Sequence, residues 1–218
     1  VFTTPFAVPV HGTPQAGRAE MRAAVRLLRE AGWTIQDGVL TDKNGKPFRF
    51  EILLPGTTFA RVAEPYAKSL QKLGIKASLR VVDPNQYELR MRKFDYDMTM
   101  EVFGQSLSPG NEQRNYWHSA TADEPGSMNV IGIKNKAVDA LVEALIAAPD
   151  RQALIVRARA LDRALLWNHY AVPLYHLDKY RLAYWNKFGQ PETAPRYGLG
   201  FPDFWWSKAA ASPAPARP

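Results

Sequence analysis

Apolar and polar residues follow two different spacings in the first half of the chain. Three segments have the short apolar or alternating pattern that is typical of strands: Phe48–Leu54, Lys76–Val82 and Asp97–Phe103. Three others repeat their apolar residues at helical spacing: Gln15–Ala31, Thr58–Leu73 and a short segment from Pro84 to about Lys93. The pattern therefore predicts helices and strands that alternate along the chain.

The order of these segments predicts the fold class. A short strand at Gly38–Thr41 precedes Phe48–Leu54, and the turn-forming sequence Asp42–Gly45 between them predicts a hairpin. From Phe48 onward the order is strand, helix, strand, helix, strand. This order favours right-handed crossovers and a parallel or mixed sheet flanked by helices, so we expect an α/β fold.

The loop after the third strand is the predicted ligand site. Ligands on open α/β sheets bind beyond the carboxyl ends of the strands, which here are Pro55–Thr58, Asp83–Gln86 and Gly104–Arg114. The last of these is dense in amide, hydroxyl, charged and aromatic side chains, which suit recognition by hydrogen bonding and stacking. The candidate ligand-binding residues are Gln105, Ser106, Leu107, Ser108, Asn111, Glu112, Gln113, Arg114, Tyr116 and Trp117.

The same loop lacks the features of a catalytic site. It has no nucleophile and base at a recognisable spacing, and Ser106 and Ser108 lack the flanking glycines of a nucleophile elbow. The chain has no cysteine, and its 4 histidines show no spacing typical of a helical zinc site. We therefore expect a binding protein rather than an enzyme, with no metal and no cofactor.

Charge suggests one alternative. The 28 Lys and Arg residues against 21 Asp and Glu residues give a net charge of +7, and Arg18, Arg22, Arg26 and Arg29 form a basic stripe on the first predicted helix. Such a stripe could serve an anion-binding or nucleic-acid-binding module. A solvated helix face is the favoured interpretation, because no aromatic or Gly-rich loop accompanies the stripe.

The second half is predicted to begin with two helices and to end in an aromatic segment. Asn135 and Asp150 are suited to cap the helices, Ala171–Leu177 has the pattern of a strand, and Arg181–Trp185 is suited to pair with it. The Pro- and Ala-rich residues 209–218 are predicted to be a disordered tail. Seven aromatic residues precede that tail: Trp185, Phe188, Tyr197, Phe201, Phe204, Trp205 and Trp206. They either pack on this domain or contact a partner lobe.

Several longer motifs together resemble a known family. These are RALDRALLWNHYAVPLYHL at Arg159–Leu177, GIKNKAVDALVEALI at Gly132–Ile146, the FDYDM strand that starts at Phe94, and QSLSPGNEQRNYW at Gln105–Trp117. In combination they resemble the family 5 extracellular solute-binding proteins of ABC importers, and most closely the YejA-like peptide-binding branch. The resemblance covers nearly all of residues 1–208.

The resemblance implies a fold, partners and a location. Family members have a periplasmic-binding-protein-like fold (type II, cluster C), in which two lobes close on a peptide or peptide-like ligand that is passed to an ABC permease of the inner membrane. Residues 1–175 would form most of the second lobe, and residues 176–208 would return to pack on the absent first lobe. The protein would be periplasmic or lipid-anchored after loss of a signal peptide that this chain does not contain. No nucleic acid is expected as a partner.

The resemblance also bears on individual loop residues. Similar oligopeptide binders have an aspartate in this loop that pairs with the ligand's amino terminus, whereas this sequence has Ser106. Glu112 could supply a replacement carboxylate, and Arg114 could pair with a ligand carboxylate or phosphate. Arg114 could equally form a salt bridge with Glu112 or Asp97. Tyr116 and Trp117 could stack on a ligand, although core anchoring is the favoured role.

Overall fold

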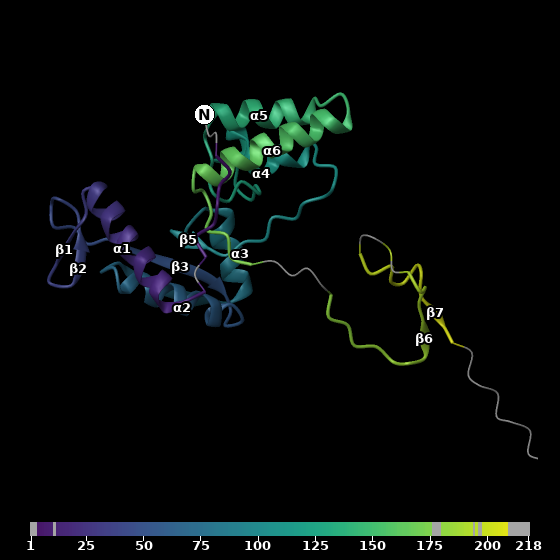
Figure 1. Cartoon of the computed structure of the whole chain (residues 1–218), viewed down its shortest axis with the longest axis horizontal. Coiled ribbons are helices and arrows are strands. Elements are labelled where there is room, and N and C mark those ends of the chain that lie inside the picture. Colours follow the sequence, from purple (N-terminus) through teal and green to yellow (C-terminus); the bar gives the residue numbers. More distant parts are fainter. Residues whose placement is uncertain (1–3, 11, 176–179, 194, 196–197, 209–218) are drawn as a thin grey trace, which may run out of the picture. The chain divides into compact units, whose positions relative to one another are not determined.

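The computed structural model describes residues 4–10, 12–175, 180–193, 195 and 198–208. The chain divides into two compact units, residues 1–172 and 173–218, and each is described by itself. Figure 1 labels the helices and strands along the chain. In these described ranges, no helix is both long enough and apolar enough to cross a membrane.

A three-stranded parallel sheet organises the first half of the larger unit. The strands β3 (Arg49–Pro55), β4 (Lys76–Val82) and β5 (Met98–Thr99) lie in the order β4-β3-β5, and β3 is parallel to both neighbours. The predicted parallel sheet is therefore confirmed. The predicted strand Asp97–Phe103 is too long, since β5 contains only two residues. The carboxylate of Asp97 accepts the backbone N–H of Glu51 at 3.0 Å, in place of a backbone carbonyl.

The predicted hairpin has a different partner. The strand β2 (Val39–Thr41) pairs in antiparallel register with β1 (Thr34–Gln36), and the turn residues Asp37 and Gly38 both have positive φ, of 49° and 77°. Before β3 begins, Pro47 forms an isolated antiparallel bridge with Thr41, and Phe48 N–H donates to the carbonyl of Leu40 at 2.8 Å. The predicted hairpin is therefore confirmed only up to Phe48, and its extension along residues 49–54 was wrong because these residues pair with β4 and β5 in the parallel sheet. The predicted turn does form: Gly45 N–H donates to the carbonyl of Asp42 at 3.0 Å.

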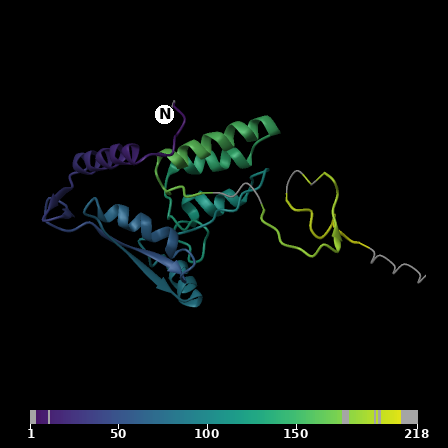
Figure 2. The same cartoon turned by 60° about the horizontal axis from the view of Figure 1, so that its bottom comes forward.

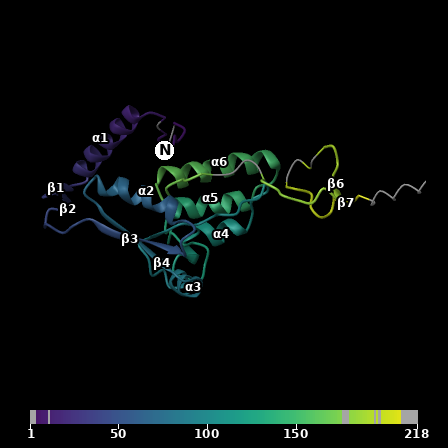
Figure 3. The same cartoon turned by 90° about the horizontal axis from the view of Figure 1, so that it is seen from below.

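Helices cover the sheet unequally on its two faces. The helices α1 (Pro14–Glu30) and α2 (Ala60–Gln71) lie on one side, and α3 (Pro84–Arg92) lies on the other (Figure 3). The first side holds the main core, formed by Leu40, Ile52, Leu54, Ala63, Ala67, Leu73, Ile75 and Ala77, with Met21, Val25 and Leu28 of α1 packed against it. On the other side, Tyr87 of α3 hydrogen-bonds Thr99 Oγ1 at 2.8 Å. The helix α3 thus covers the part of the sheet near its carboxyl end.

Local sequence signals explain where these helices begin. Asp83 caps α3 by accepting the N–H groups of Asn85 at 3.0 Å and Gln86 at 3.1 Å, as predicted, and Pro84 occupies the first turn. Thr13 caps α1 through the N–H of Ala16. These caps satisfy backbone N–H groups at the helix starts through hydrogen bonds within one turn of chain.

The second half of the larger unit is helical. It contains α4 (Glu112–Trp117), the 3-10 turn η1 (Ser119–Thr121), α5 (Lys136–Ile146) and α6 (Arg151–Trp167). The helices α5 and α6 run side by side (green in Figure 1 and Figure 2). Asn135 and Asp150 cap them as predicted, accepting from Ala137 N at 2.9 Å and Ala153 N at 2.7 Å. A second core lies among these helices, formed by Trp117, Ile133, Val138, Val142, Leu145 and Leu161.

The smaller unit contains little regular structure. The strands β6 (Phe188–Gly189) and β7 (Trp206–Ser207) pair in antiparallel register. The strand predicted at Ala171–Leu177 is absent over residues 171–175, and its last two residues lie outside the described ones. Arg181–Trp185 is not a strand either. The predicted disordered tail, residues 209–218, also lies outside the described residues. A strand propensity without a neighbouring strand does not suffice to form a strand.

Candidate functional site

The segment that follows β5 leaves the carboxyl edge of the sheet, where the sequence placed the ligand site. Residues 100–106 belong to no helix or strand, and Gln105, Ser106, Leu107 and Ser108 are all exposed. The exposed fraction of Leu107 is 57%, and that of Val102 is 79%. The segment therefore presents an irregular backbone with polar and apolar side chains at the surface.

Contacts from the helical half hold this segment in place. The guanidinium of Arg151, the first residue of α6, donates to the carbonyl of Leu107 at 2.6 Å and to Ser108 Oγ at 3.3 Å. The hydroxyl of Tyr116 donates to the carbonyl of Gly104 at 3.2 Å. The loop is thus tied at both ends to side chains that come from later helices. Arg151 was not predicted, because its distance from the loop in sequence gives no signal of contact.

The end of the predicted site is a helix, and two of its side chains point into the protein. Gln113 and Trp117 of α4 are buried, at 3% and 8% exposed. Trp117 Nε1 donates to Gln113 Oε1 at 2.9 Å, and Gln113 Nε2 donates to Gln105 Oε1 at 2.8 Å. These bonds give Gln113 and Trp117 a structural role beneath the loop. Tyr116 lies against Phe103, with ring centroids 5.9 Å apart, and is partly buried.

Arg114 is paired, but with a residue that the sequence did not indicate. Its guanidinium makes a two-pronged contact with the Glu143 carboxylate of α5, at 2.6 Å and 2.5 Å. Neither of the predicted partners, Glu112 and Asp97, makes this pair, because α4 packs its Arg114 side against α5. The hydrogen bond from Arg114 lowers the pKa of Glu143 below its ordinary value and raises the pKa of Arg114 itself. Arg114 also contacts Asn111 Oδ1 at 3.4 Å.

Glu112 is the first residue of α4, and its carboxylate accepts hydrogen bonds at the start of this helix. Its Oε1 accepts the backbone N–H of Gly110 at 2.8 Å and the side-chain amide of Gln113 at 3.2 Å. The Gly110 hydrogen bond is the main cause of a pKa of Glu112 below the ordinary value, so the group is a carboxylate at neutral pH. Glu112 is exposed, and it is the acidic side chain among the predicted ligand-binding residues.

His118 follows α4 and lies between two carboxylates. Its Nδ1 is 4.0 Å from Asp139 and its Nε2 is 3.9 Å from Glu143. The Nδ1 atom accepts the N–H of Ala120 at 3.1 Å, which orients the ring. No cluster of three or more His, Asp or Glu side chains placed to hold a metal ion occurs in the part of the chain that the structure describes.

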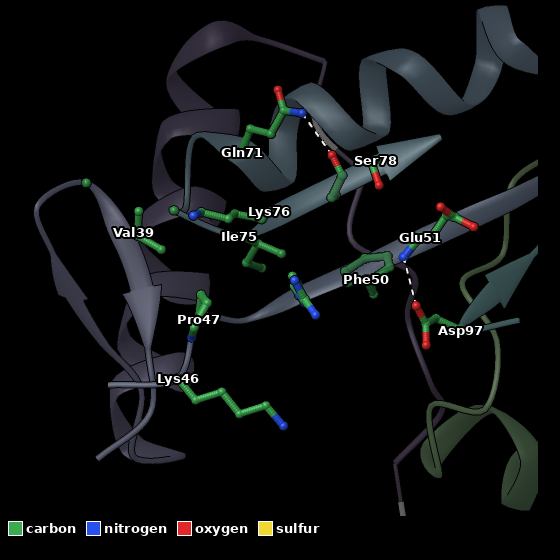
Figure 4. A pocket seen from close by; sticks show the side chains of 14 residues that line it. Val39, Lys46, Pro47, Phe50, Glu51, Gln71, Ile75, Lys76, Ser78 and Asp97 are labelled. Atoms are coloured by element: carbon green, nitrogen blue, oxygen red, sulfur yellow. Dashed lines mark hydrogen bonds between the residues drawn. The ribbon is translucent and has the colours of Figure 1, made fainter. Parts of the chain in front are cut away.

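A second concave region lies elsewhere in the larger unit. It is an open hollow of about 900 Å³ between the hairpin and the amino ends of β3 and β4 (Figure 4). Its lining is formed by Gly38, Val39, Lys46, Pro47, Arg49, Phe50, Glu51, Gln71, Gly74, Ile75, Lys76, Ala77, Ser78 and Asp97. Because Arg49 and Lys76 begin their strands, this hollow and the loop after β5 lie at opposite ends of the sheet.

The sequence matches a family described as bacterial extracellular solute-binding proteins, family 5, over residues 2–125. The match covers more than half of the chain, and the chain belongs to this family. The predicted resemblance is confirmed, including its YejA-like branch. Over 97% of its length the chain is 44% identical to a probable peptide-binding protein, YejA, of Agrobacterium fabrum. It is 51% identical over 99% of its length to an uncharacterized protein, y4wM, of Sinorhizobium fredii.

Solved structures agree on the fold. The oligopeptide-binding protein AppA of Bacillus subtilis, in complex with a nonapeptide, superposes with a TM-score of 0.66 over 85% of this chain and 37% of its own, at 20% identity. A periplasmic oligopeptide-binding protein of Thermotoga maritima, bound to mannohexaose, gives a TM-score of 0.59 over 67% of this chain and 29% of its own, at 23% identity. The predicted periplasmic-binding-protein-like fold is confirmed.

The chain is short beside these relatives. It spans 33% of y4wM and 35% of the Agrobacterium YejA. The chain therefore corresponds to about a third of the length of each of these relatives.

Proposed function

We propose that this chain is part of the substrate-binding component of an ABC importer, which binds peptides or peptide-like compounds outside the cytoplasm and delivers them to a membrane permease. The observation that carries this proposal is family membership together with 44% identity to a probable peptide-binding protein. The protein would act by binding alone, without a catalytic step.

The geometry after β5 supports a peptide ligand. Residues 100–106 belong to no helix or strand and lie beside exposed polar side chains. An extended peptide can use such a stretch for main-chain hydrogen bonds, which makes recognition tolerant of ligand sequence. The exposed residues Gln105, Ser106, Leu107, Ser108, Asn111 and Glu112 would contact the ligand, and Arg114, Gln113, Tyr116 and Trp117 would complete the site from behind.

Closure of two lobes would complete the cleft. We expect residues 1–175 to belong to the second lobe and residues 176–208 to pack on the first lobe. Ligand contacts from both lobes would stabilise the closed state that the permease recognises. The comparisons give no support to the alternative use of the Arg18–Arg29 stripe, in which Arg26 is already paired with Glu30 at 2.9 Å.

Calorimetry tests the proposal on the longer protein that contains this chain. We expect saturable binding from a peptide library, weakened by Asn111→Ala and unchanged by Asn44→Ala, an exposed asparagine in the Asp42–Gly45 turn that precedes the amino end of β3. Absence of binding from every peptide fraction would reject a peptide receptor. Equal binding by the parent and Asn111→Ala would remove the loop as the site while leaving the function open.

A second variant tests how the ligand's amino terminus is recognised. Ser106→Asp would place a carboxylate in the exposed loop, where it can pair with an ammonium group. We expect roughly a fivefold to tenfold gain in affinity for a peptide with a free amino terminus. The matched control is the same peptide with an acetylated amino terminus, whose affinity should not rise. Equal gains for both peptides would show that the amino terminus is bound elsewhere.

A further inference from the structure

We propose that the hollow between the hairpin and the amino ends of β3 and β4 binds a phosphorylated small molecule, with its phosphate held by Arg49, Lys46 and Lys76. The hollow of about 900 Å³ is within the size range of small-molecule sites. It is separate from the loop after β5, so this inference does not depend on the peptide-binding proposal.

The register of the sheet brings two of these cations together. Arg49 of β3 lies directly opposite Lys76 of β4 in the parallel pair, so both side chains project from the same face. Both are exposed. Like charges that face each other on neighbouring strands are destabilising, and a bound anion would remove that repulsion. Figure 4 shows Lys76 and Lys46 at the end of the hollow nearest the hairpin.

Among the described residues, these cations have no carboxylate partner. In the part of the chain that the structure describes, Lys46, Arg49 and Lys76 take part in no ion pair. Other arginines near the sheet are paired: Arg90 lies 3.0 Å from Asp95. The positive charge at this end of the hollow is therefore available to a ligand.

The acidic side chains of the lining are already engaged at the other end. Glu51 lies between Arg80 and Arg90, at 3.8 Å from each, and neither arginine lines the hollow. Asp97 accepts the backbone N–H of Glu51. Figure 4 shows Glu51 and Asp97 together, away from Lys46 and Lys76. The hollow thus has a cationic end and an acidic end, whose carboxylates are engaged in an ion pair at Glu51 and in a hydrogen bond at Asp97.

The chemistry of the lining favours a phosphate group with an organic body. An arginine presents a planar fork of donors to an oxyanion, and two lysines add point charges, which together suit a dianion better than a single carboxylate. The hollow exceeds the volume of a phosphate ion, and Phe50, Ile75 and Val39 supply apolar surface for the remainder of the molecule. Arg49 and Lys76 are both exposed, so this end of the sheet is open to a ligand.

Calorimetry with pyrophosphate, at constant ionic strength, tests the proposal on the 218-residue chain. We expect saturable binding that the double variant Arg49→Gln/Lys76→Gln weakens by at least roughly tenfold. Lys46→Gln should weaken it by a smaller factor. The matched control is Lys43→Gln, in the same turn as Lys46 but outside the hollow, and it should change affinity by less than about twofold. All four side chains are exposed, so these variants keep the core intact.

Amide chemical shifts locate the ligand. Pyrophosphate and glucose 6-phosphate should shift the amides of residues 46–51 and 75–78, whereas glucose should not. Shifts confined to α1 would place the anion on the Arg18–Arg29 stripe and overturn the proposal. Binding of phosphatidylglycerol vesicles without binding of either soluble phosphate would identify a lipid surface instead. Citrate bound more tightly than pyrophosphate would replace the phosphate by a carboxylate ligand and overturn the ligand class.

Discussion

Gln113 is a buried side chain whose hydrogen bonds support the candidate ligand-binding loop. It is buried and bonds Trp117 on one side and Gln105 on the other, so it links the second core to the exposed segment. A buried amide with both ends paired is stable, whereas loss of one partner leaves a donor without an acceptor. Gln113 therefore holds the loop through its hydrogen bond to Gln105.

Gln113→Ala should therefore destabilise the protein. The variant leaves the indole N–H of Trp117 buried without its acceptor, and we expect the free energy of unfolding to fall by about 1–3 kcal/mol. Urea denaturation monitored by tryptophan fluorescence measures this change. Gln105→Ala is the control: Gln105 is exposed, and Gln113 keeps its contact with Glu112, so the loss should stay below about 1 kcal/mol. Equal losses in the two variants would contradict the role of Gln113.

Side-chain chemistry in the loop was predictable from the sequence, but side-chain direction was not. Glu112, Gln113 and Arg114 are adjacent, and all three are polar. The helix α4 directs their side chains to different surroundings. The carboxylate of Glu112 is exposed, the amide of Gln113 is buried, and the guanidinium of Arg114 contacts α5. Helical rotation of about 100° per residue sends neighbours to different surfaces, and the sequence pattern had indicated a loop here.

At the scale of elements, the approach of the hairpin to the sheet depends on Gly74. Its φ is +81°, its carbonyl accepts Leu40 N–H at 2.8 Å, and a Cβ atom here would lie 2.8 Å from Leu40 N. Gly74 therefore permits both the turn after α2 and the close contact with β2. The sequence indicated only that a glycine ends the helix.

Gly74→Ala should lower the free energy of unfolding by at least about 2 kcal/mol, because left-handed strain and a backbone clash add together. Thermal unfolding followed by circular dichroism measures it. The matched control is Gly45→Ala, whose φ is +77° with open space around the added atom. That control should cost about 1–2 kcal/mol from strain alone. If the two variants lose the same free energy of unfolding, the contact with Leu40 adds no destabilisation beyond the backbone strain.

The link between α4 and α5 should make stability depend on pH. The folded-state pKa of Glu143 lies below its ordinary value of 4.5, because Arg114 donates to the carboxylate. A carboxylate with a lowered folded pKa adds stability that is present above its unfolded pKa and is lost as pH falls through the folded one. Stability should therefore decline as pH drops below about 4.5.

Glu143→Gln isolates this contribution. The variant should lose a little stability at neutral pH, because the pair is about half exposed, and its unfolding midpoint should then decline less steeply than that of the parent as acid is added. Urea midpoints measured at a series of pH values give the comparison. Glu88→Gln, which removes an exposed pair with Arg92, is the control. Parallel profiles for parent and Glu143→Gln would show that the pair does not govern acid stability.

At the scale of the whole molecule, the smaller unit exposes more aromatic surface than a stable surface usually carries. The exposed fractions are 79% for Trp185, 60% for Phe201, 57% for Phe204 and 53% for Trp206. Within the unit, Trp205 packs edge-on against Tyr184 and Phe201. Tyr197, also counted in the aromatic segment, lies outside the described residues. We retain the proposal that this surface contacts a first lobe.

Trp185→Ser tests whether Trp185 contacts a first lobe in the longer protein. In the 218-residue chain the exposed indole makes few contacts, so the free energy of unfolding should change by no more than about 0.5 kcal/mol. In the longer protein, burial against the first lobe should raise the cost to at least about 2 kcal/mol. Leu89→Ser, at an exposed position on α3, should be neutral in both. A neutral Trp185→Ser in the longer protein would reject lobe contact at this residue.

Local physics accounts for what the sequence determined by itself. Periodicity and capping residues were enough for the helices α1, α2, α3, α5 and α6, because these signals act between residues within a few turns of chain. The order of helices and strands was enough for the parallel sheet and the α/β class. The family followed from longer motifs that combine such signals. Three features required the tertiary structure: the short β5, the pairing of β3 with the parallel sheet instead of the hairpin, and the pairing of Arg114 with Glu143. Each depends on segments distant in sequence that compete for the same partner, and that competition is settled only when the chain is packed.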